Sequence, residues 1–275
     1  MKKVFLATIG FAILAVAAFA ANVGDFESVP NTPGFFVQGY PAYVTASKIY
    51  DADGESQDLA NNWKGFSFAV RPSYCGTVNN HRWTLSAVVP YASYDLGVGE
   101  TQSGISDVQV SAAYWLWDNR NNNYLSVWFW TDVPTGDDEK GLGTGQMNLR
   151  PGLAYSWDKY PYQVQTSAFY NLRMKNSDTE LKPGDEIWAN FSVGYSFQPN
   201  FMLGAELESS WGQDEKLNSV TVTDSKENSF KVGPSVQYQL MPNLGFKVKG
   251  LYTAFGKNTP QTFDIWARLS YSFGH

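Results

Sequence analysis

The feature that most constrains this chain is an alternation of apolar and polar residues, which recurs along most of the sequence after about Phe35. It is clear in residues 187–197, and it returns in residues 230–240 and 263–273. In the first of these segments one face carries Ile187, Ala189, Phe191, Val193, Tyr195 and Phe197. A period of two over such a length is typical of a β-strand with one apolar and one polar side. These segments also match the ~10 residues with which a tilted strand crosses a bilayer.

The first twenty residues have the features of a cleavable signal peptide. Lys2 and Lys3 form a short positive region, residues 4–17 are apolar, and Ala18-Phe19-Ala20 has the small-x-small pattern of a cleavage site. The apolar run is shorter than the ~20 residues that a spanning helix needs. We therefore expect a signal peptide over residues 1–20. No later apolar run is long enough for a spanning helix, so a membrane-spanning form of this chain must use closed strands.

The alternation and the turn residues together predict twelve strands. They cover about 35–49, 65–76, 81–95, 105–117, 123–133, 147–157, 162–174, 185–198, 201–213, 228–240, 244–255 and 262–273. Short connections alternate with longer ones rich in Gly and Asp, which is typical of an outer-membrane barrel. We therefore expect an all-β fold, a transmembrane antiparallel up-and-down β-barrel over residues 35–275, after a periplasmic segment at 21–34. The register of 35–49 and of 123–133 stays ambiguous.

Composition narrows the alternatives. Aromatic residues make up 16% of the chain and charged residues only 17%, which fits a soluble β-sandwich or propeller as well as a barrel with aromatic girdles. The regular alternation of short and long connections favours the barrel. The formal net charge is −6, and without Lys2 and Lys3 it would be −8, so nucleic acid is not an expected partner. The single cysteine, Cys75, cannot form an intramolecular disulfide.

If the apolar faces meet lipid, the polar faces form the lumen. A Lys or Arg that faced lipid at mid-membrane would cost ~2–4 kcal/mol, which favours this register. The charged residues then expected in the lumen are Arg71, Arg150, Arg173, Glu206, Glu208, Lys231, Lys247, Lys249, Asp264 and Arg268. Counted from the periplasmic turns, Arg71, Glu206, Lys249 and Arg268 could share one level. Two interpretations are open: a layer of salt bridges that fills a narrow barrel, or a constriction that sets selectivity.

Large aromatic residues point inward by the same register. They are Trp115, Trp117, Phe169, Trp188 and Trp266. Trp128 and Trp130 are ambiguous, because both faces of 123–133 are apolar and a slip of one residue turns every side chain to the other face. A partly aromatic lumen would suit amphipathic or aromatic solutes.

Sites for catalysis and for metals are weakly represented. Only His81 and His275 could act as imidazole bases, and neither lies where a barrel hydrolase would need it. Residues 141–145 are Gly-rich but lack the Lys-Ser/Thr ending of a phosphate loop. The acidic clusters at 51–58, 137–139 and 214–227 lack the spacing of a calcium loop. We expect no enzyme, no cofactor and no dedicated metal site.

Several motifs of the middle of the chain resemble a known family. They are Gly104-Ile105-Ser106-Asp107-Val108, Asp132-Val133-Pro134-Thr135-Gly136, Gly143-Thr144-Gly145, Pro183-Gly184-Asp185 and Val193-Gly194-Tyr195. Together they resemble the outer-membrane transporters named after the meta-pathway of phenol degradation, with Ser106 where that family would have Gly. The resemblance implies a transporter-like barrel that admits aromatic compounds, and it carries over no catalytic residues.

These observations lead to one main expectation and two alternatives. We expect an outer-membrane channel for passive diffusion of small solutes, with a gate or constriction in the loop at 134–146. The loop residues singled out are Pro134, Thr135, Gly136, Gly143 and Gly145. The expected partners are the lipid bilayer, lipopolysaccharide, small solutes and the barrel-assembly machinery, which recognises final strands that end in aromatic residues such as Phe273. The alternatives are a closed barrel that acts through its acidic loops and, less favoured, an enzyme.

Overall fold

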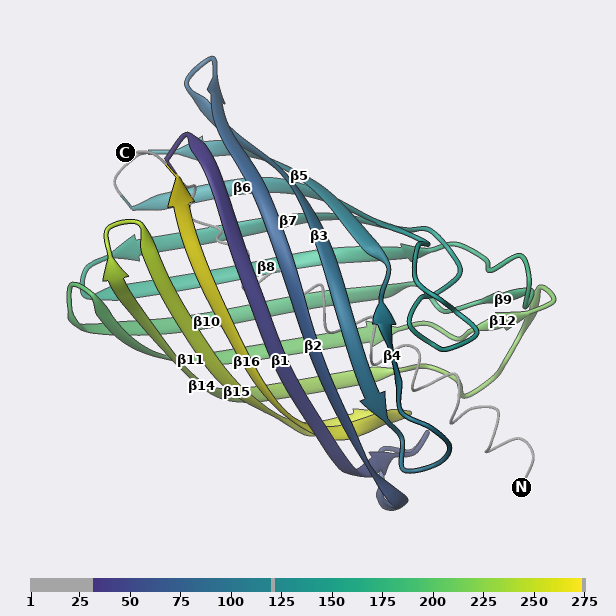
Figure 1. Cartoon of the computed structure of the whole chain (residues 1–275). Coiled ribbons are helices and arrows are strands. Elements are labelled where there is room, and N and C mark those ends of the chain that lie inside the picture. The colour runs from purple at the N-terminus through teal and green to yellow at the C-terminus, as the bar shows by residue number, and fades with distance from the viewer. Residues whose placement is uncertain (1–31, 120–121, 274–275) are drawn as a thin grey trace.

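Hydrogen bonds between the first and last strands close the sheet of this protein into a barrel. The computed structural model describes residues 32–119 and 122–273. Its long strands are β1 (Gly34–Tyr50), β2 (Ser56–Val78), β3 (His81–Asp95), β5 (Val108–Asp118), β6 (Asn123–Val133), β7 (Asn148–Lys159), β8 (Tyr162–Arg173), β10 (Glu186–Gln198), β11 (Phe201–Gly212), β14 (Asn228–Met241), β15 (Leu244–Lys257) and β16 (Thr259–Phe273). Each pairs antiparallel with the next along the chain, and β1 pairs with both β2 and β16 (Figure 1). The predicted all-β, twelve-stranded, up-and-down barrel is confirmed.

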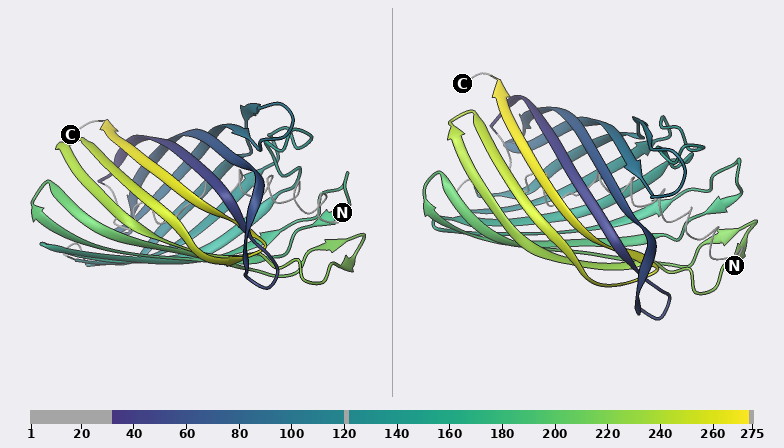
Figure 2. Two further views of the ribbon diagram at one scale, coloured as in Figure 1. Left: turned by 90° about the horizontal axis from the view of Figure 1, so that it is seen from below. Right: turned by 60° about the horizontal axis from the view of Figure 1, so that its bottom comes forward.

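Four short strands lie outside this cylinder of long strands. β4 (Gln102–Ile105) extends one end by pairing with β3 alone. β9 (Leu181–Lys182), β12 (Lys216–Leu217) and β13 (Val220–Thr221) form a small sheet within the long loops at the same end of the barrel. Figure 2 shows the long strands inclined to the barrel axis, so that strands on opposite walls cross. This inclination is the tilt that closure of a sheet requires.

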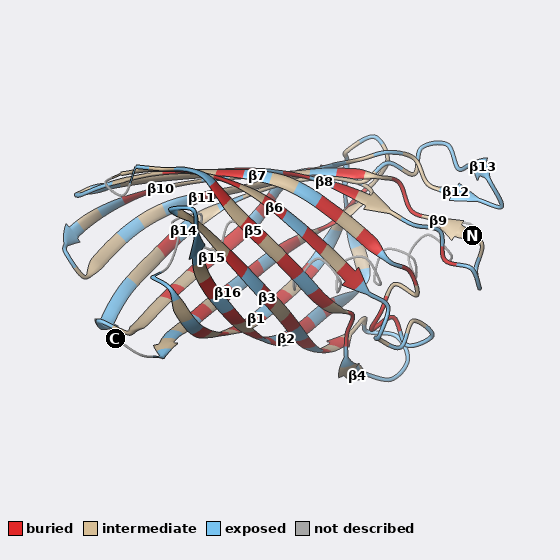
Figure 3. Ribbon diagram, turned by 90° about the horizontal axis from the view of Figure 1, so that it is seen from above, coloured by how far each residue is buried: buried red, intermediate tan, exposed pale blue. Residues whose placement is uncertain are grey.

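Burial follows the period of two along each strand. In β1, Gln38, Tyr40 and Ala42 are 3–4% exposed, whereas Tyr43 is 42% exposed. Figure 3 shows the same alternation along β2 and β3. The buried side chains face the lumen, and the exposed ones form an apolar outer surface. In the ranges that the structure describes, no helix is long and apolar enough to cross a membrane.

The two ends of the barrel differ in their connections. Asn79 and Asn80, with φ values of 50° and 64°, form the two-residue turn between β2 and β3, as the sequence predicts for this end. The long loops lie at the other end, but two hairpins there are tighter than expected. β2 already begins at Ser56, and only Asn258 separates β15 from β16. The predicted strand 105–117 is also interrupted, at residues 106–107 between β4 and β5.

Outward aromatic rings gather at the end with the short turns. Tyr162 and Tyr195 lie 5.4 Å apart between ring centroids, and Phe35 and Phe273 lie 5.5 Å apart. Similar contacts join Tyr195 to Phe197 and Phe201 to Tyr238. A girdle of this kind marks the membrane–water interface of outer-membrane barrels. Phe273, in the last strand, is part of it.

A lysine placed on the outer surface tests this orientation. Ile265 is 46% exposed in the paired part of β16, and Leu240 is 51% exposed beside the turn after β14. Ile265→Lys should lower the free energy of unfolding by ~2–4 kcal/mol, whereas Leu240→Lys at the interface should cost ~0–1 kcal/mol. Urea titration in lipid vesicles, followed by heat-modifiable gel mobility, measures both. Equal losses for the two variants would contradict the assigned membrane depth.

Candidate functional site

The inner surface of the barrel has a charged part and an aromatic part. The charged wall comes from neighbouring strands and consists of Glu206, Glu208, Lys231, Lys247, Lys249, Asp264 and Arg268. The aromatic wall consists of Tyr40, Trp115, Trp128, Trp130, Phe169 and Trp266, with Trp188 packed against it. All of them lie on lumen-facing positions of their strands, as the alternation predicts. The part that these residues play in selectivity stays a prediction.

Ion pairs organise the charged wall. Lys247 Nζ lies 2.8 Å from Glu206, Lys249 Nζ lies 2.5 Å from Glu208, and Lys231 Nζ lies 2.5 Å from Asp264. Each pair spans an intervening strand, because β14 lies between β11 and β15, and β15 lies between β14 and β16. Glu206 thus pairs with Lys247, whereas the sequence had suggested Lys249 at the level of Glu206. The Lys249 side chain is only 2% exposed, so these pairs are largely shielded from water.

The arginines on the other strands have different partners. Arg150 pairs with Asp132 on β6, and Arg173 lies 2.5 Å from Glu186 on β10. Arg71 donates from Nε to Ser86 Oγ at 3.0 Å and from Nη1 to Gln38 Oε1 at 3.3 Å. Neither Asp132 nor Glu186 was expected in the lumen from the sequence. Both are at strand ends, and the ambiguous register of 123–133 hid the fact that Asp132 shares the inner face with Trp130.

The aromatic wall resolves the ambiguous tryptophans. Trp128 and Trp130 are 4% and 1% exposed and stack with 6.0 Å between ring centroids, so both point inward. The inward prediction for Trp117 is wrong, because this side chain is 56% exposed on the outer surface. A β-bulge between Trp115 and Trp117 inserts one extra residue and reverses the side on which Trp117 lies.

Cations lie over several of these rings. Lys249 Nζ is 4.7 Å from the centroid of Trp266, and Arg150 Cζ is 5.1 Å from that of Trp188. Arg71 Cζ lies 5.3 Å from the centroid of Trp130. Such cation–π contacts are attractive and strengthen when water is excluded. The inner surface therefore presents ring faces and charged groups next to each other.

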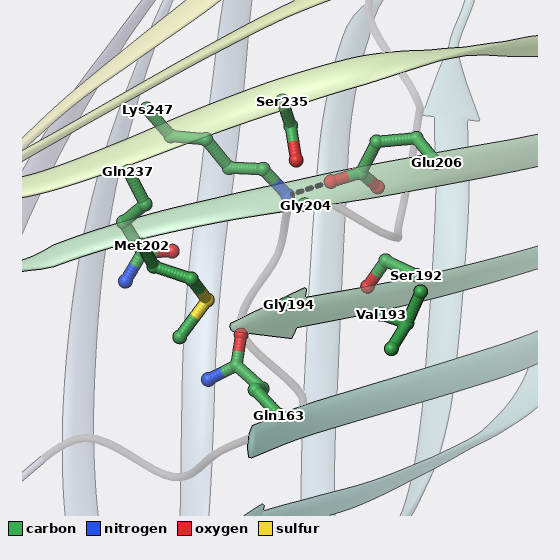
Figure 4. Close-up of a pocket in the computed structure, with 10 residues that line it drawn as sticks. All are labelled: Gln163, Ser192, Val193, Gly194, Met202, Gly204, Glu206, Ser235, Gln237 and Lys247. Carbon is green, nitrogen blue, oxygen red and sulfur yellow. Dashed lines mark ion pairs between the residues drawn. The ribbon is translucent and has the colours of Figure 1, made fainter. Parts of the chain in front are cut away.

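A small hollow opens into the lumen beside the charged wall (Figure 4), and it lies toward the end with short turns. It is lined by Gln163, Ser192, Val193, Gly194, Met202, Gly204, Glu206, Ser235, Gln237 and Lys247. The ion pair of Lys247 and Glu206 crosses one side of it, as the dashed line in Figure 4 shows. Most of the groups that line the hollow are amides, hydroxyls and this ion pair, so its lining is mainly polar.

At the opposite end, one carboxylate gathers the motifs that carry the family resemblance. Asp107 Oδ1 accepts hydrogen bonds from the backbone N–H groups of Thr135 and Gly136 at 3.1 and 3.0 Å. Its Oδ2 accepts from Thr144 N at 2.7 Å and from Thr144 Oγ1 at 2.8 Å. We call this arrangement the Asp107 clasp. It explains why the strand breaks between β4 and β5, since residues 106–107 bind the loop instead of continuing the ladder.

The glycines of the predicted gating loop allow the backbone to approach Asp107 closely enough to form this clasp. A Cβ on Gly143 would come within 2.7 Å of Asp107 Oδ1 and of Gly136 O, so only glycine lets the loop cross itself here. Gly145 adopts φ +62°, in the left-handed region that favours glycine. Pro134 and Thr135 form the first side of the loop, and the Thr135 hydroxyl accepts from Val108 N at 2.9 Å. The predicted loop residues are thus structural parts of one closed turn.

The clasp directs the loop toward the lumen. Leu142 is 2% exposed and packs with Ala92 and Tyr94, which occupy lumen-facing positions of β3. The Ser106 hydroxyl donates to Leu142 O, and the Tyr94 hydroxyl donates to Lys140 O. The loop between β6 and β7 therefore narrows the barrel at the end that carries the long loops.

Breaking the clasp should release the loop. Asp107→Asn replaces one carboxylate oxygen by an amide that cannot accept from Thr144, so we expect trypsin to cut after the exposed Lys140 about tenfold faster. Mass spectrometry of the fragments measures the rate at this bond. Asp178→Asn, in the loop between β8 and β9, is the matched control and should leave it unchanged. Equal rates in the parent and Asp107→Asn proteins would show that the clasp does not hold the loop.

Carboxylates also meet at the mouth with the long loops, around Arg173. Glu186 pairs with Arg173, and the partly buried Glu215 and Glu227 lie in the loop between β11 and β14. The pKa of Glu227 is raised to about 8, mainly by burial; Arg173 lowers it, and the carboxylates of Glu186 and Glu215 add to the increase. Burial also raises the pKa of Glu215, again against Arg173. Near neutral pH, Glu227 is therefore mostly protonated.

This shift makes stability depend on pH with a defined sign. An unfolded Glu releases its proton near pH 4.5, whereas folded Glu227 keeps it up to about pH 8, so rising pH favours the unfolded state between these values. Glu227→Gln should remove this loss. Urea midpoints at about pH 5 and about pH 9 compare the parent with the variant. The same pH slope in both proteins would place Glu227 in contact with water.

The described residues hold no group of His, Cys, Asp and Glu that could bind a metal ion. His81 Nδ1 lies 2.9 Å from Trp115 O, and its ring stacks on Tyr114 at 5.3 Å. His275 lies outside the described residues. In this part of the chain, no histidine is paired with a nucleophile.

Comparisons with known proteins agree with this architecture. The chain is similar to the crystal structure of the COG4313 outer membrane channel from Pseudomonas putida F1, with a TM-score of 0.81 and 15% identity. The superposition covers 92% of this chain and 100% of that one. It is also similar to the translocator domain of the autotransporter NalP from Neisseria meningitidis, with a TM-score of 0.54, 12% identity and 98% of each chain covered. The CymD monoaromatic hydrocarbon channel gives a TM-score of 0.50 at 9% identity, over 89% of this chain and 90% of that one.

At these identities the structural comparisons show the fold, that of outer-membrane barrels, and not the activity. No curated protein sequence matches the chain. A family model, however, matches residues 46–269, which is most of the chain and includes the clasp, the charged wall and all of the aromatic wall except Tyr40. The chain therefore belongs to the family described as "Putative MetA-pathway of phenol degradation".

Proposed function

We propose that this protein is an outer-membrane channel through which small solutes diffuse passively. The observation that carries the proposal is the inner surface of the barrel, where charged and aromatic side chains line the same space. A barrel that served only as a scaffold could fill its interior with small apolar residues. Here the lumen holds buried Lys and Arg side chains, whose transfer from water is costly unless they are paired. Membership of a family of transporter-like barrels supports the same proposal.

The lining favours solutes that are aromatic or amphipathic. A ring can stack on Trp130 or Trp266, while a polar substituent reaches the cation that lies over the same ring, Arg71 or Lys249. The residues proposed to set selectivity are Arg71, Arg150, Arg173, Glu206, Glu208, Lys231, Lys249, Asp264 and Arg268, with the rings of Trp115, Phe169, Trp188 and Trp266. One structural relative, CymD, is described as a monoaromatic hydrocarbon channel, which agrees with this choice of solutes. The loop held by the Asp107 clasp is the proposed constriction at the outer mouth.

A closed barrel that acts through its loops is the second candidate. The observation in its favour is that several inward side chains are almost inaccessible, with Trp130 at 1% and Arg150 and Phe169 at 2% exposure. Such a protein would contact its surroundings through the acidic loops. An enzyme is less favoured, because His81 is engaged by Trp115 O and Tyr114.

The channel function places the protein in a bacterial outer membrane. We propose export by a signal peptide at residues 1–20, followed by a periplasmic segment that ends where β1 begins at Gly34; residues 1–31 lie outside the described structure. The outer apolar surface would contact the lipid bilayer, and the loops would contact lipopolysaccharide. Assembly would use the barrel-assembly machinery, with Phe273 at the end of β16 as part of the recognised strand.

Solute flux into liposomes tests the proposal. Purified protein, shown to be folded by heat-modifiable gel mobility, should admit small sugars, amino acids and simple phenols faster than protein-free vesicles do. A faster rate for phenols than for sugars of similar size would support the aromatic lining as the selective element. Folded protein that admits none of these solutes would exclude the channel and favour the closed barrel.

A further inference from the structure

The hollow near the short turns differs chemically from the rest of the lumen. It lies on β8, β10, β11, β14 and β15, away from the stacked tryptophans of β6. Its apolar lining is small, and Met202 supplies the apolar side chain, because Val193 lies on the outer face of β10, where it is 41% exposed. The enclosed part of the hollow is small and opens to the rest of the lumen, so a solute bound there would be small and would lie against the channel wall.

Glycines help to shape this space. A Cβ on Gly194 would come within 2.3 Å of Met202 Sδ, and one on Gly204 would come within 2.7 Å of Ser235 Oγ. Because these two residues have no side chains, only backbone faces the lumen at these positions of β10 and β11. The side chains that border the hollow instead rise from its sides, where Gln163, Gln237 and Lys247 extend into the lumen (Figure 4).

Opposite charges face each other across one side of the hollow. Lys247 Nζ and the Glu206 carboxylate lie 2.8 Å apart, and their side chains are 9% and 7% exposed. The amides of Gln163 and Gln237 and the hydroxyls of Ser192 and Ser235 add further donors and acceptors. The hollow thus offers one cation, one anion and several neutral polar groups within the reach of a single small molecule.

We propose that the hollow is a binding site for small zwitterions, with the solute carboxylate against Lys247 and its ammonium group against Glu206. This inference rests on the proposed channel function and names a solute class for one site in it. An anion alone would draw Lys247 away and leave Glu206 buried without its partner. A cation alone would draw Glu206 away and leave Lys247 buried without its partner. Either loss is costly in a shielded setting. A zwitterion replaces one ion pair by two.

Glycine and its uncharged isomer glycolamide are matched probes for this site. We expect liposomes with the parent protein to take up labelled glycine about tenfold faster than glycolamide at low solute concentration, the ratio expected from a charge-assisted hydrogen bond. In Glu206→Gln/Lys247→Gln the two rates should become equal. Glu206→Gln alone should shift the preference toward acetate, because Lys247 then keeps its charge without the carboxylate.

A second ion pair supplies the control. Lys175 and Glu180 lie 2.7 Å apart in an exposed loop, so Lys175→Gln/Glu180→Gln removes the same two charges outside the lumen and should keep the preference for glycine. Equal uptake of glycine and glycolamide by the parent would overturn the zwitterion site and leave the channel standing. Faster uptake of acetate than of glycine would make it an anion site instead. If no solute enters above the protein-free background, both the channel and the site are excluded.

Discussion

The pairing of backbone polar groups in a bilayer is the constraint on which the rest of this structure depends. No water reaches the hydrocarbon core, so each strand needs a neighbour on both sides, and only a closed sheet provides one for every strand. The pairing of β1 with β16, for example of Gly39 with Leu269, meets this demand. Closure then divides the side chains of every strand between lipid and lumen. All charges in the spanning strands must share the lumen, because the lipid face would penalise them.

The sequence predicts this division well and its details poorly. Alternation placed Arg71, Lys249 and Trp266 on the inner face, because a period of two leaves only two choices and lipid excludes one of them for a cation. Partner choice depends on the stagger between strands, which no local pattern records. Lys247 therefore reaches Glu206 across β14, a contact that counting from the turns missed. Trp117 shows the other limit. The β-bulge after Trp115 turns the Trp117 side chain from the lumen to the outer surface, and the local sequence of Ala, Trp and Leu residues does not indicate a bulge.

The loop motif shows how much a local element can depend on distant residues. Ser106-Asp107 and Thr144 are far apart in the sequence, yet the Asp107 carboxylate binds Thr135, Gly136 and Thr144 together. Several N–H and O–H donors on one carboxylate make charge-assisted hydrogen bonds, which are stronger than neutral ones. From the sequence, these residues are a family signature and part of a predicted gate, but Asp107 has no predicted role. A Gly-rich loop can be recognised locally, whereas the distant carboxylate that accepts its hydrogen bonds cannot. The clasp uses a break in one strand to hold a loop over the mouth.

In the proposed channel, the selectivity of the lumen would depend on which buried charges lose their partners when a solute binds. The buried Arg and Lys side chains already have partners, either carboxylates such as Glu208 and Asp132 or the faces of Trp266 and Trp188. A solute that takes one member of a pair leaves the other without compensation, and in a shielded space that loss exceeds the gain of a single new contact. A solute that carries both charges would avoid this loss, as would an aromatic solute whose ring takes the place of a tryptophan ring beside the cation. In the proposed channel, paired charges would therefore discriminate against simple ions even though the lumen is rich in charge.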